Sequence, residues 1–153
     1  MSGMYPVLVR VRGIQRDETG RENTIESVSA GRHSVKNGKH YILYDDLLLN
    51  EKQKTPTVLK FHDGELVLLR RGGMDQELRF RKGMQTQSKY RTPYGTLDMA
   101  VRTTRLDICC GLLEGRIDAE YDIAVNGQYQ STNRLHIEVT RIADRKEKTI
   151  RQD

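Results

Sequence analysis

Three two-residue turn signals constrain the fold of this chain more than any other feature of its sequence. They are Asn37-Gly38, Asp63-Gly64 and Asn126-Gly127. Asn-Gly and Asp-Gly readily adopt the positive φ angles that type I′ turns require, and such turns join neighbouring antiparallel strands. The flanking segments are strand-like: 32–36 and 39–45, 57–62 and 65–71, and 116–125 and 128–141. The sequence therefore predicts three β-hairpins with two-residue type I′ turns.

Apolar and polar residues alternate along most of the chain. In the segments 7–12, 97–102, 116–125 and 135–139, apolar side chains occupy every second position. This period of two is typical of strands that bury one face and expose the other. No segment has a convincing helical period, although residues 45–54 suggest one short helical turn. We therefore predict an all-β protein.

The number of strands decides between a barrel and an open sheet. About eight or more one-sided strands joined by short turns must protect two exposed sheet edges, and closure removes both edges. An open two-sheet sandwich is the competing architecture, but consecutive hairpins favour an up-and-down order over Greek-key connections. The sequence predicts a closed antiparallel up-and-down β-barrel that forms a single domain over residues 1–143, followed by a charged C-terminal tail at 144–153.

Composition and charge argue against several other classes of protein. No apolar stretch approaches the roughly 18 residues that cross a bilayer, and residues 1–12 lack the apolar core of a signal peptide. We therefore expect a cytoplasmic protein with no membrane partner. The net charge of +5 is modest and spread along the chain, so it does not by itself indicate nucleic-acid binding. Cys109 and Cys110 are adjacent, so their side chains point to opposite faces of a strand, and we interpret them as plain thiols.

A series of short motifs runs in order along the chain. It comprises Tyr41-Ile-Leu-Tyr44-Asp45, Arg71-Gly72-Gly73 followed by Leu78 and Phe80, Gly83 before Tyr90, Thr92-Pro-Tyr94-Gly95 before Leu97 and Met99, Gly115 before Ile117 and Tyr121, and Asn133 to Ile137. With this order and spacing, the chain resembles the YwiB-like family of small bacterial proteins of unknown function. The resemblance implies a closed antiparallel barrel of roughly eight strands, of the lipocalin-like or calycin-like type. It implies no established activity, cofactor or catalytic residue.

The four histidines do not form a catalytic or metal-binding motif. His33, His40, His62 and His136 lie in separate predicted strands, without a nucleophile motif and without His-x-His or Cys-x-x-Cys spacing. We interpret them as isolated surface histidines, and a pair assembled by the fold, such as His40 with His62, is the alternative. The sequence therefore predicts no catalytic residue, no metal site and no cofactor.

Tyrosine and arginine residues are the best candidates for ligand contacts. The chain has seven tyrosines but only two phenylalanines, and a tyrosine combines an apolar ring with a hydroxyl that can hold a polar ligand. Arg70 and Arg71, the two arginines beside the Gly72-Gly73 pair, can clamp an anion at a barrel mouth. The candidate ligand-binding residues are Tyr41, Tyr44, Arg71, Tyr90, Tyr94 and Tyr121. For each tyrosine the alternative is a structural role, as for Tyr121 filling the core.

These features support four hypotheses, in descending order. The first is a barrel that binds a small molecule or an anion inside or at its mouth, which requires an interior cavity. The second is a protein-interaction or structural module, self-associating into a homo-oligomer through an apolar patch at an outward-facing Leu8 or Leu106. Nucleic-acid binding through a basic face ranks third, because acidic residues on the same faces favour cross-strand ion pairs. Catalysis ranks last.

Overall fold

The computed structural model describes residues 4–46, 55–71, 75–111 and 113–142. These residues form ten strands and no helix. The strands are β1 (Tyr5–Asp17), β2 (Glu22–Lys36), β3 (Lys39–Asp46), β4 (Thr55–His62), β5 (Glu65–Arg70), β6 (Asp75–Arg81), β7 (Gln85–Thr92), β8 (Gly95–Cys110), β9 (Glu114–Val125) and β10 (Gln128–Arg141). Across these ranges there is accordingly no helix long and apolar enough to span a membrane.

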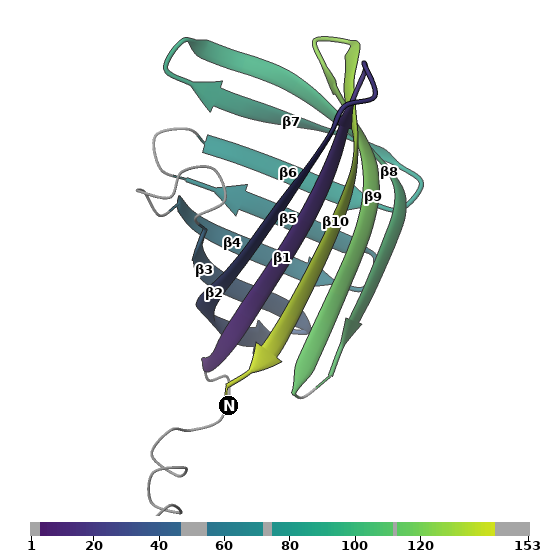
Figure 1. Cartoon of the computed structure of the whole chain (residues 1–153). Helices are drawn as coiled ribbons and strands as arrows, with labels where there is room; N and C mark the ends of the chain where they lie inside the picture. The colour runs from purple at the N-terminus through teal and green to yellow at the C-terminus, as the bar shows by residue number, and fades with distance from the viewer. Residues whose placement is uncertain (1–3, 47–54, 72–74, 112, 143–153) are drawn as a thin grey trace, which may run out of the picture.

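The ten strands close into one antiparallel barrel (Figure 1). Each strand pairs with its neighbours in the sequence, and β1 closes the barrel by pairing with β10, with Val7 opposite Arg141 and Val11 opposite Ile137. This up-and-down order confirms the predicted closed barrel and excludes the two-sheet sandwich. The barrel has ten strands, whereas the resemblance implied roughly eight.

The three predicted two-residue hairpins are all present, but their turns differ in conformation. Asn37 and Gly38 have φ angles of 52° and 77°, and Asn126 and Gly127 have 49° and 82°, as type I′ turns require. In the Asp63-Gly64 turn only the glycine has a positive φ, of 89°. A positive φ confined to the second central residue is the pattern of a type II turn, so the type I′ prediction is wrong there.

Inward-facing side chains from all around the barrel form one hydrophobic core. The alternation read from the sequence gives the buried face correctly on β1 and β9, where Val7, Val9, Ile117 and Ala119 are each at most 1% exposed. On β5 the inward positions are Leu66, Leu68 and then Arg70, so a charged residue follows two buried leucines on the same face. The core therefore gives way to polar side chains toward one end of the barrel.

Leu106 faces the core, which contradicts its predicted outward position. The pairing of β8 with β9 shifts by one residue between Thr103 and Arg105, as at a β-bulge. A bulge inserts one residue and reverses the alternation beyond it. Thr103 and Leu106 are consequently both buried, at 1% and 8% exposed. Leu106 cannot contribute to an exposed apolar patch, and Leu8 is only partly exposed.

Three of the sequence predictions fall outside the described residues. Most of the suggested helical turn at 45–54 does so, and its first residues belong to β3 instead. The Gly72-Gly73 pair beside the proposed anion clamp and the charged tail at 144–153 lie wholly outside the described ranges.

Candidate functional site

A cavity of about 270 Å³ lies inside one end of the barrel. Strands β5, β6 and β7 form one wall, and β1, β2, β9 and β10 form the other. This is the end at which the β1–β2 and β9–β10 turns lie, at the top of Figure 1. Five of its polar lining residues are Arg70, Gln76, Tyr90, Tyr121 and Asn133. Gln15 and Arg134 also line it, together with apolar residues such as Val11 and Leu78.

The polar side chains of the cavity form two rows, one on each wall. On the first wall Arg70 lies directly opposite Gln76 in the pairing of β5 with β6, and Gln76 lies opposite Tyr90 in the pairing of β6 with β7. On the second wall Tyr121 of β9 lies opposite Asn133 of β10. Residues paired directly across antiparallel strands point to the same face. Two rows of hydrogen-bonding groups therefore face each other across the cavity.

The charged residues that the structure describes in the cavity lining are both arginines. Among the described residues that line it, Arg70 and Arg134 are the charged ones, and neither an aspartate nor a glutamate is present. Burial raises the pKa of Tyr121 to about 12, while the nearby positive charge of Arg70 acts in the opposite direction. Tyr121 is thus a neutral hydrogen-bond donor at physiological pH. Its ring is held edge-on against Phe80, with ring centroids 4.6 Å apart.

Only two of the candidate ligand-binding residues line the cavity. These are Tyr90 and Tyr121. Tyr44 points inward but is packed in the core, with 5% of its surface exposed. Arg71 follows the end of β5 and is exposed, with its Nη1 3.9 Å from Asp75 Oδ2.

The remaining two candidates lie away from the cavity lining. Tyr41 lies on the outer face, where Lys60 Nζ is 6.0 Å from its ring centroid. Tyr94 is 99% exposed in the turn between β7 and β8. In that turn its backbone nitrogen donates to Thr92 Oγ1 at 3.1 Å.

Gln76 and Asn133 line the cavity but were not among the candidates, and Arg70 was proposed only together with Arg71 as an anion clamp. A usable signal existed for Arg70, because it continues the Leu66 and Leu68 alternation and so shares their inward face. No such signal existed for Gln76 and Asn133, because their positions opposite Arg70 and Tyr121 depend on the register of the closed barrel.

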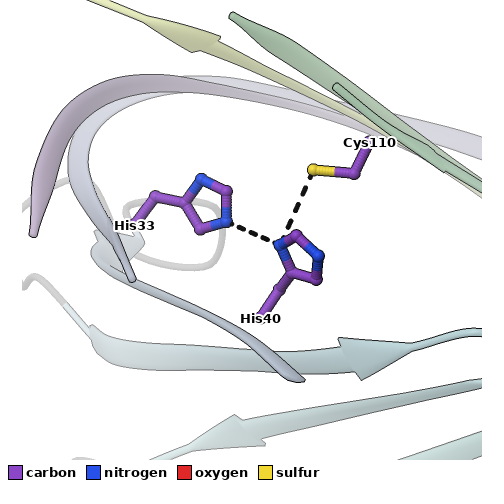
Figure 2. Close-up of side chains that lie close together, drawn as sticks. All are labelled: His33, His40 and Cys110. Carbon is purple, nitrogen blue, oxygen red and sulfur yellow. Dashed lines mark hydrogen bonds between the residues drawn. The ribbon is translucent and has the colours of Figure 1, made fainter. Parts of the chain in front are cut away.

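A second cluster of functional side chains lies inside the opposite end of the barrel. Figure 2 shows His33, His40 and Cys110 pointing toward one another. His33 Nε2 is 2.9 Å from His40 Nδ1, and Cys110 Sγ is 3.7 Å from the same His40 nitrogen. Burial lowers the pKa of both histidines and raises the pKa of the Cys110 thiol. The neighbouring charges of His40 and Arg141 lower the pKa of His33 further.

This cluster corrects two interpretations made from the sequence. His33 and His40 are not isolated surface residues, because His33 is 8% exposed and bonds directly to His40. The alternative pair, His40 with His62, does not form, and His62 Nε2 lies 3.4 Å from Glu65 Oε1 instead. His136 does lie on the outer face as predicted, with its Nδ1 2.6 Å from Asp118 Oδ1.

Comparison with known proteins identifies the family but not an activity. The chain is 26% identical over 132 residues to the "Uncharacterized beta-barrel protein YwiB" of Bacillus subtilis (strain 168), which covers 86% of this chain and 91% of that protein. The crystal structure of that ywiB protein superposes with a TM-score of 0.80 at 25% identity, covering 92% of this chain and 94% of the other. The model of the family described as "Domain of unknown function (DUF1934)" matches residues 9–137. The chain therefore belongs to this YwiB-like family of uncharacterised bacterial β-barrel proteins.

Proposed function

We propose that this protein binds a small anionic molecule, one with a carboxylate or a phosphate group, in the cavity lined by Arg70 and Tyr121. The observation that carries the proposal is the composition of the lining, which combines arginine with neutral hydrogen-bonding groups and, among its described residues, holds no acid. A guanidinium group is well suited to carboxylates and phosphates because it presents several donors in one plane.

The other polar groups of the cavity complement an anion in the same way. The Tyr121 hydroxyl, the Gln76 amide and the Asn133 amide all carry hydrogens that can be donated, and the Asn133 Nδ2 at present donates to Ser131 Oγ at 3.0 Å. Apolar residues such as Val11 and Leu78 can contact the hydrocarbon part of the same ligand. The volume of about 270 Å³ lies just below the range of roughly 300–1,000 Å³ typical of ligand pockets. A small metabolite fits this description better than a large cofactor does.

Two buried hydroxyls beside the cavity lining further support a polar occupant. The Oγ of Ser27 and the Oγ1 of Thr103 have no hydrogen-bond partner among the described residues. Ser27 lies opposite Val11, and Thr103 lies opposite Tyr121. A buried hydroxyl without a partner is costly, and a ligand or water nearby relieves that cost.

The proposal is tested by thermal unfolding of the protein in the presence of a panel of small carboxylates and phosphate esters. At least one class should raise the melting temperature in a concentration-dependent manner, because a ligand that binds only the folded state stabilises it by mass action. Arg70→Gln should abolish that shift, whereas Arg71→Gln, which changes the same charge on the neighbouring exposed residue, should keep it. No shift with any compound, or equal loss in both variants, rejects the proposal.

A cytoplasmic location is part of the same proposal. Cys109 and Cys110 are free thiols, and free cysteines are typical of reducing compartments. Fractionation of the source cells should recover the protein with cytosolic markers, and recovery from an extracytoplasmic fraction would contradict this assignment.

A further inference from the structure

We propose that His33, His40 and Cys110 form a three-ligand site for a zinc ion at the end of the barrel opposite the Arg70 cavity. The three ligand atoms, one from each side chain, all lie within 4.8 Å of one another. Imidazole nitrogen and thiolate sulfur are the ligands that zinc binds most often in proteins. The proposal is independent of the anion-binding function, because the two sites share no residue.

The two histidines are brought together by the register of one hairpin. The Asn37-Gly38 turn pairs Val35 with His40 and His33 with Ile42. His33 and His40 are therefore diagonal neighbours on one face of the β2–β3 hairpin, and that face is the interior of the barrel, since Ile42 is fully buried. Their nearest nitrogens already lie 2.9 Å apart.

The orientation of the imidazole rings is fixed by stacking. The His40 ring lies almost parallel to Phe61, with centroids 4.8 Å apart and an interplanar angle of 6°. The His33 ring stacks on His40, with centroids 5.1 Å apart. Stacking thus holds the ring planes with His33 Nε2 2.9 Å from His40 Nδ1, and Cys110 Sγ lies 3.7 Å from the same His40 nitrogen (Figure 2).

Cys110 reaches this point from a distant part of the chain. It is the last residue of β8, on the inward face, and packs against the core. Its partner across to β9 is Gly115, where an added Cβ would lie 3.0 Å from the Cys110 sulfur. The absence of a side chain at Gly115 therefore leaves the sulfur uncovered. Cys109, the residue before Cys110, is exposed and lies opposite Arg116 in the pairing of β8 with β9. It therefore offers no ligand to the cluster.

The two distances around His40 Nδ1 are close to those that a tetrahedral zinc ion requires. Zinc–nitrogen and zinc–sulfur bonds of about 2.0 and 2.3 Å at tetrahedral angles place two nitrogens roughly 3.3 Å apart and a nitrogen roughly 3.6 Å from sulfur. The observed distances around His40 Nδ1 are 2.9 Å to His33 Nε2 and 3.7 Å to Cys110 Sγ. All three ligand atoms lie within 4.8 Å of one another, and His40 and Cys110 are partly exposed, so solvent can reach the cluster.

Protons and charges balance when the ion binds. The Cys110 thiol loses its proton to solvent, and the imidazole proton shared between the two rings moves to the other nitrogen of its own ring. The positive charge of the Arg141 guanidinium acts on His33 and therefore disfavours binding of a cation beside His33. This guanidinium is held over the Tyr5 ring, with Cζ 3.8 Å from the ring centroid. The thiolate supplies the negative charge that offsets it.

Titration of the tag-free, reduced, metal-free protein with Co²⁺ tests the site. Cobalt occupies zinc sites and, when bound to a thiolate, gives a sulfur-to-cobalt charge-transfer absorption in the near ultraviolet. We expect that absorption at one equivalent, and its loss when Zn²⁺ is added. A wild-type protein that shows no such absorption and no stabilisation by Zn²⁺ overturns the proposal, and the histidine pair is then only a hydrogen-bonded part of the core.

Matched variants locate the ligands. Cys110→Ser should remove the absorption, while Cys109→Ser, the same substitution on the adjacent exposed residue, should retain it. His40→Asn should lower the zinc affinity by at least about tenfold, since even loss of a residue that only supports a ligand has an effect of this size. Circular dichroism identifies which variants are folded. If only one of Cys110→Ser and His40→Asn folds, that variant alone tests the assignment. Retention of the absorption in a folded Cys110→Ser or loss in a folded Cys109→Ser contradicts the assignment.

Discussion

Arg70 on β5 and Tyr121 on β9 face the same cavity from opposite walls of the barrel. The guanidinium charge of Arg70 is close enough to act on the pKa of the Tyr121 phenol, which burial otherwise raises. This relationship brings a permanent cation and a neutral hydroxyl donor into one enclosed space. A small anion is the ligand that we propose for this cavity.

Removal of the Arg70 charge should weaken binding of the anionic ligand by about 10- to 100-fold, the effect of losing a hydrogen bond to a charged group. Arg71→Gln is the matched control, because Arg71 is exposed and lies outside the cavity lining. Isothermal titration of both variants with the compound that stabilises the wild type measures the difference. Equal affinities in the two variants would show that the ligand does not bind where Arg70 lies.

Gly13→Val should block the cavity without unfolding the protein. A Cβ at Gly13 meets no atom within 4 Å, and Gly13 lines the cavity. A valine there fills open space and suits a strand, so we expect stability to change by less than about 1 kcal/mol. Ligand-induced stabilisation should disappear. If Gly13→Val binds as well as the wild type, the ligand lies elsewhere.

Gly31→Ala, on the neighbouring strand β2, should lower the stability of the protein, in contrast to Gly13→Val. A Cβ at Gly31 would lie 2.7 Å from the Leu43 carbonyl oxygen and 3.1 Å from Tyr44 Cβ. Such overpacking costs about 1–3 kcal/mol. Urea unfolding of both glycine variants should therefore separate them clearly, and an unchanged stability in Gly31→Ala would contradict the close approach of β2 and β3.

Glu65 should stabilise the barrel at neutral pH but not in acid. Burial acts to raise its pKa, but the hydrogen bond and charge of Arg79 and the charge of Arg81 lower it overall. A carboxyl group with a depressed folded-state pKa contributes stability above its ordinary pKa near 4.5, and that contribution is lost as the pH falls through the folded-state value. We expect Glu65→Gln to cost about 1–3 kcal/mol at pH 7, and progressively less below about pH 4.

Glu77→Gln is the control for this ion-pair network. Glu77 Oε2 lies 3.7 Å from Arg79 Nη2, but its side chain is 49% exposed, against 13% for Glu65. An exposed pair of this kind contributes at most about 1 kcal/mol. Urea unfolding at neutral and acidic pH should show a pH-dependent deficit for Glu65→Gln alone, and equal deficits at both pH values would refute the ionic explanation.

The contribution of His136 to stability should depend on pH in the direction opposite to that of Glu65. The hydrogen bond that His136 donates to Asp118 raises the pKa of His136, with Glu138 adding to the effect. A histidine with a raised folded-state pKa contributes stability below its ordinary pKa of about 6.5, and the contribution is lost as the pH rises through the folded-state value. Because the side chains of His136 and Asp118 are 37% and 33% exposed, the effect is at most about 1 kcal/mol. The stability difference between wild type and His136→Gln should shrink from pH 6 to pH 8, and a growing difference would contradict this assignment.

The fold was predictable because the barrel strands repeat simple local rules. Alternation identified Val7, Val9 and Val11 as a buried face, and dipeptide turns placed three of the hairpins. Leu106 was misplaced because the bulge between Thr103 and Arg105 changes the phase of β8. A bulge of this kind leaves little trace in the sequence.

The candidate sites were less predictable because they are assembled across strands. Tyr121 and Tyr90 could be proposed from their chemistry, but Gln76 and Asn133 gain a role only through their cross-strand partners. The pairing of His33 with His40 follows from the Asn37-Gly38 turn once its register is counted. Cys110 could not be added from the sequence, because its approach to His40 spans 70 residues and depends on closure of the barrel.

The most direct test of the anion-binding account is native mass spectrometry of the wild-type protein and the Gly13→Val variant, each purified gently from the same bacterial host. We expect the wild type to carry a small acidic molecule in stoichiometric amount, released and identified on unfolding, and the variant to be empty. An identical small molecule on both proteins, or an empty wild type that also fails to bind any carboxylate or phosphate added to it, would contradict the claim that the Arg70–Tyr121 cavity is a binding site.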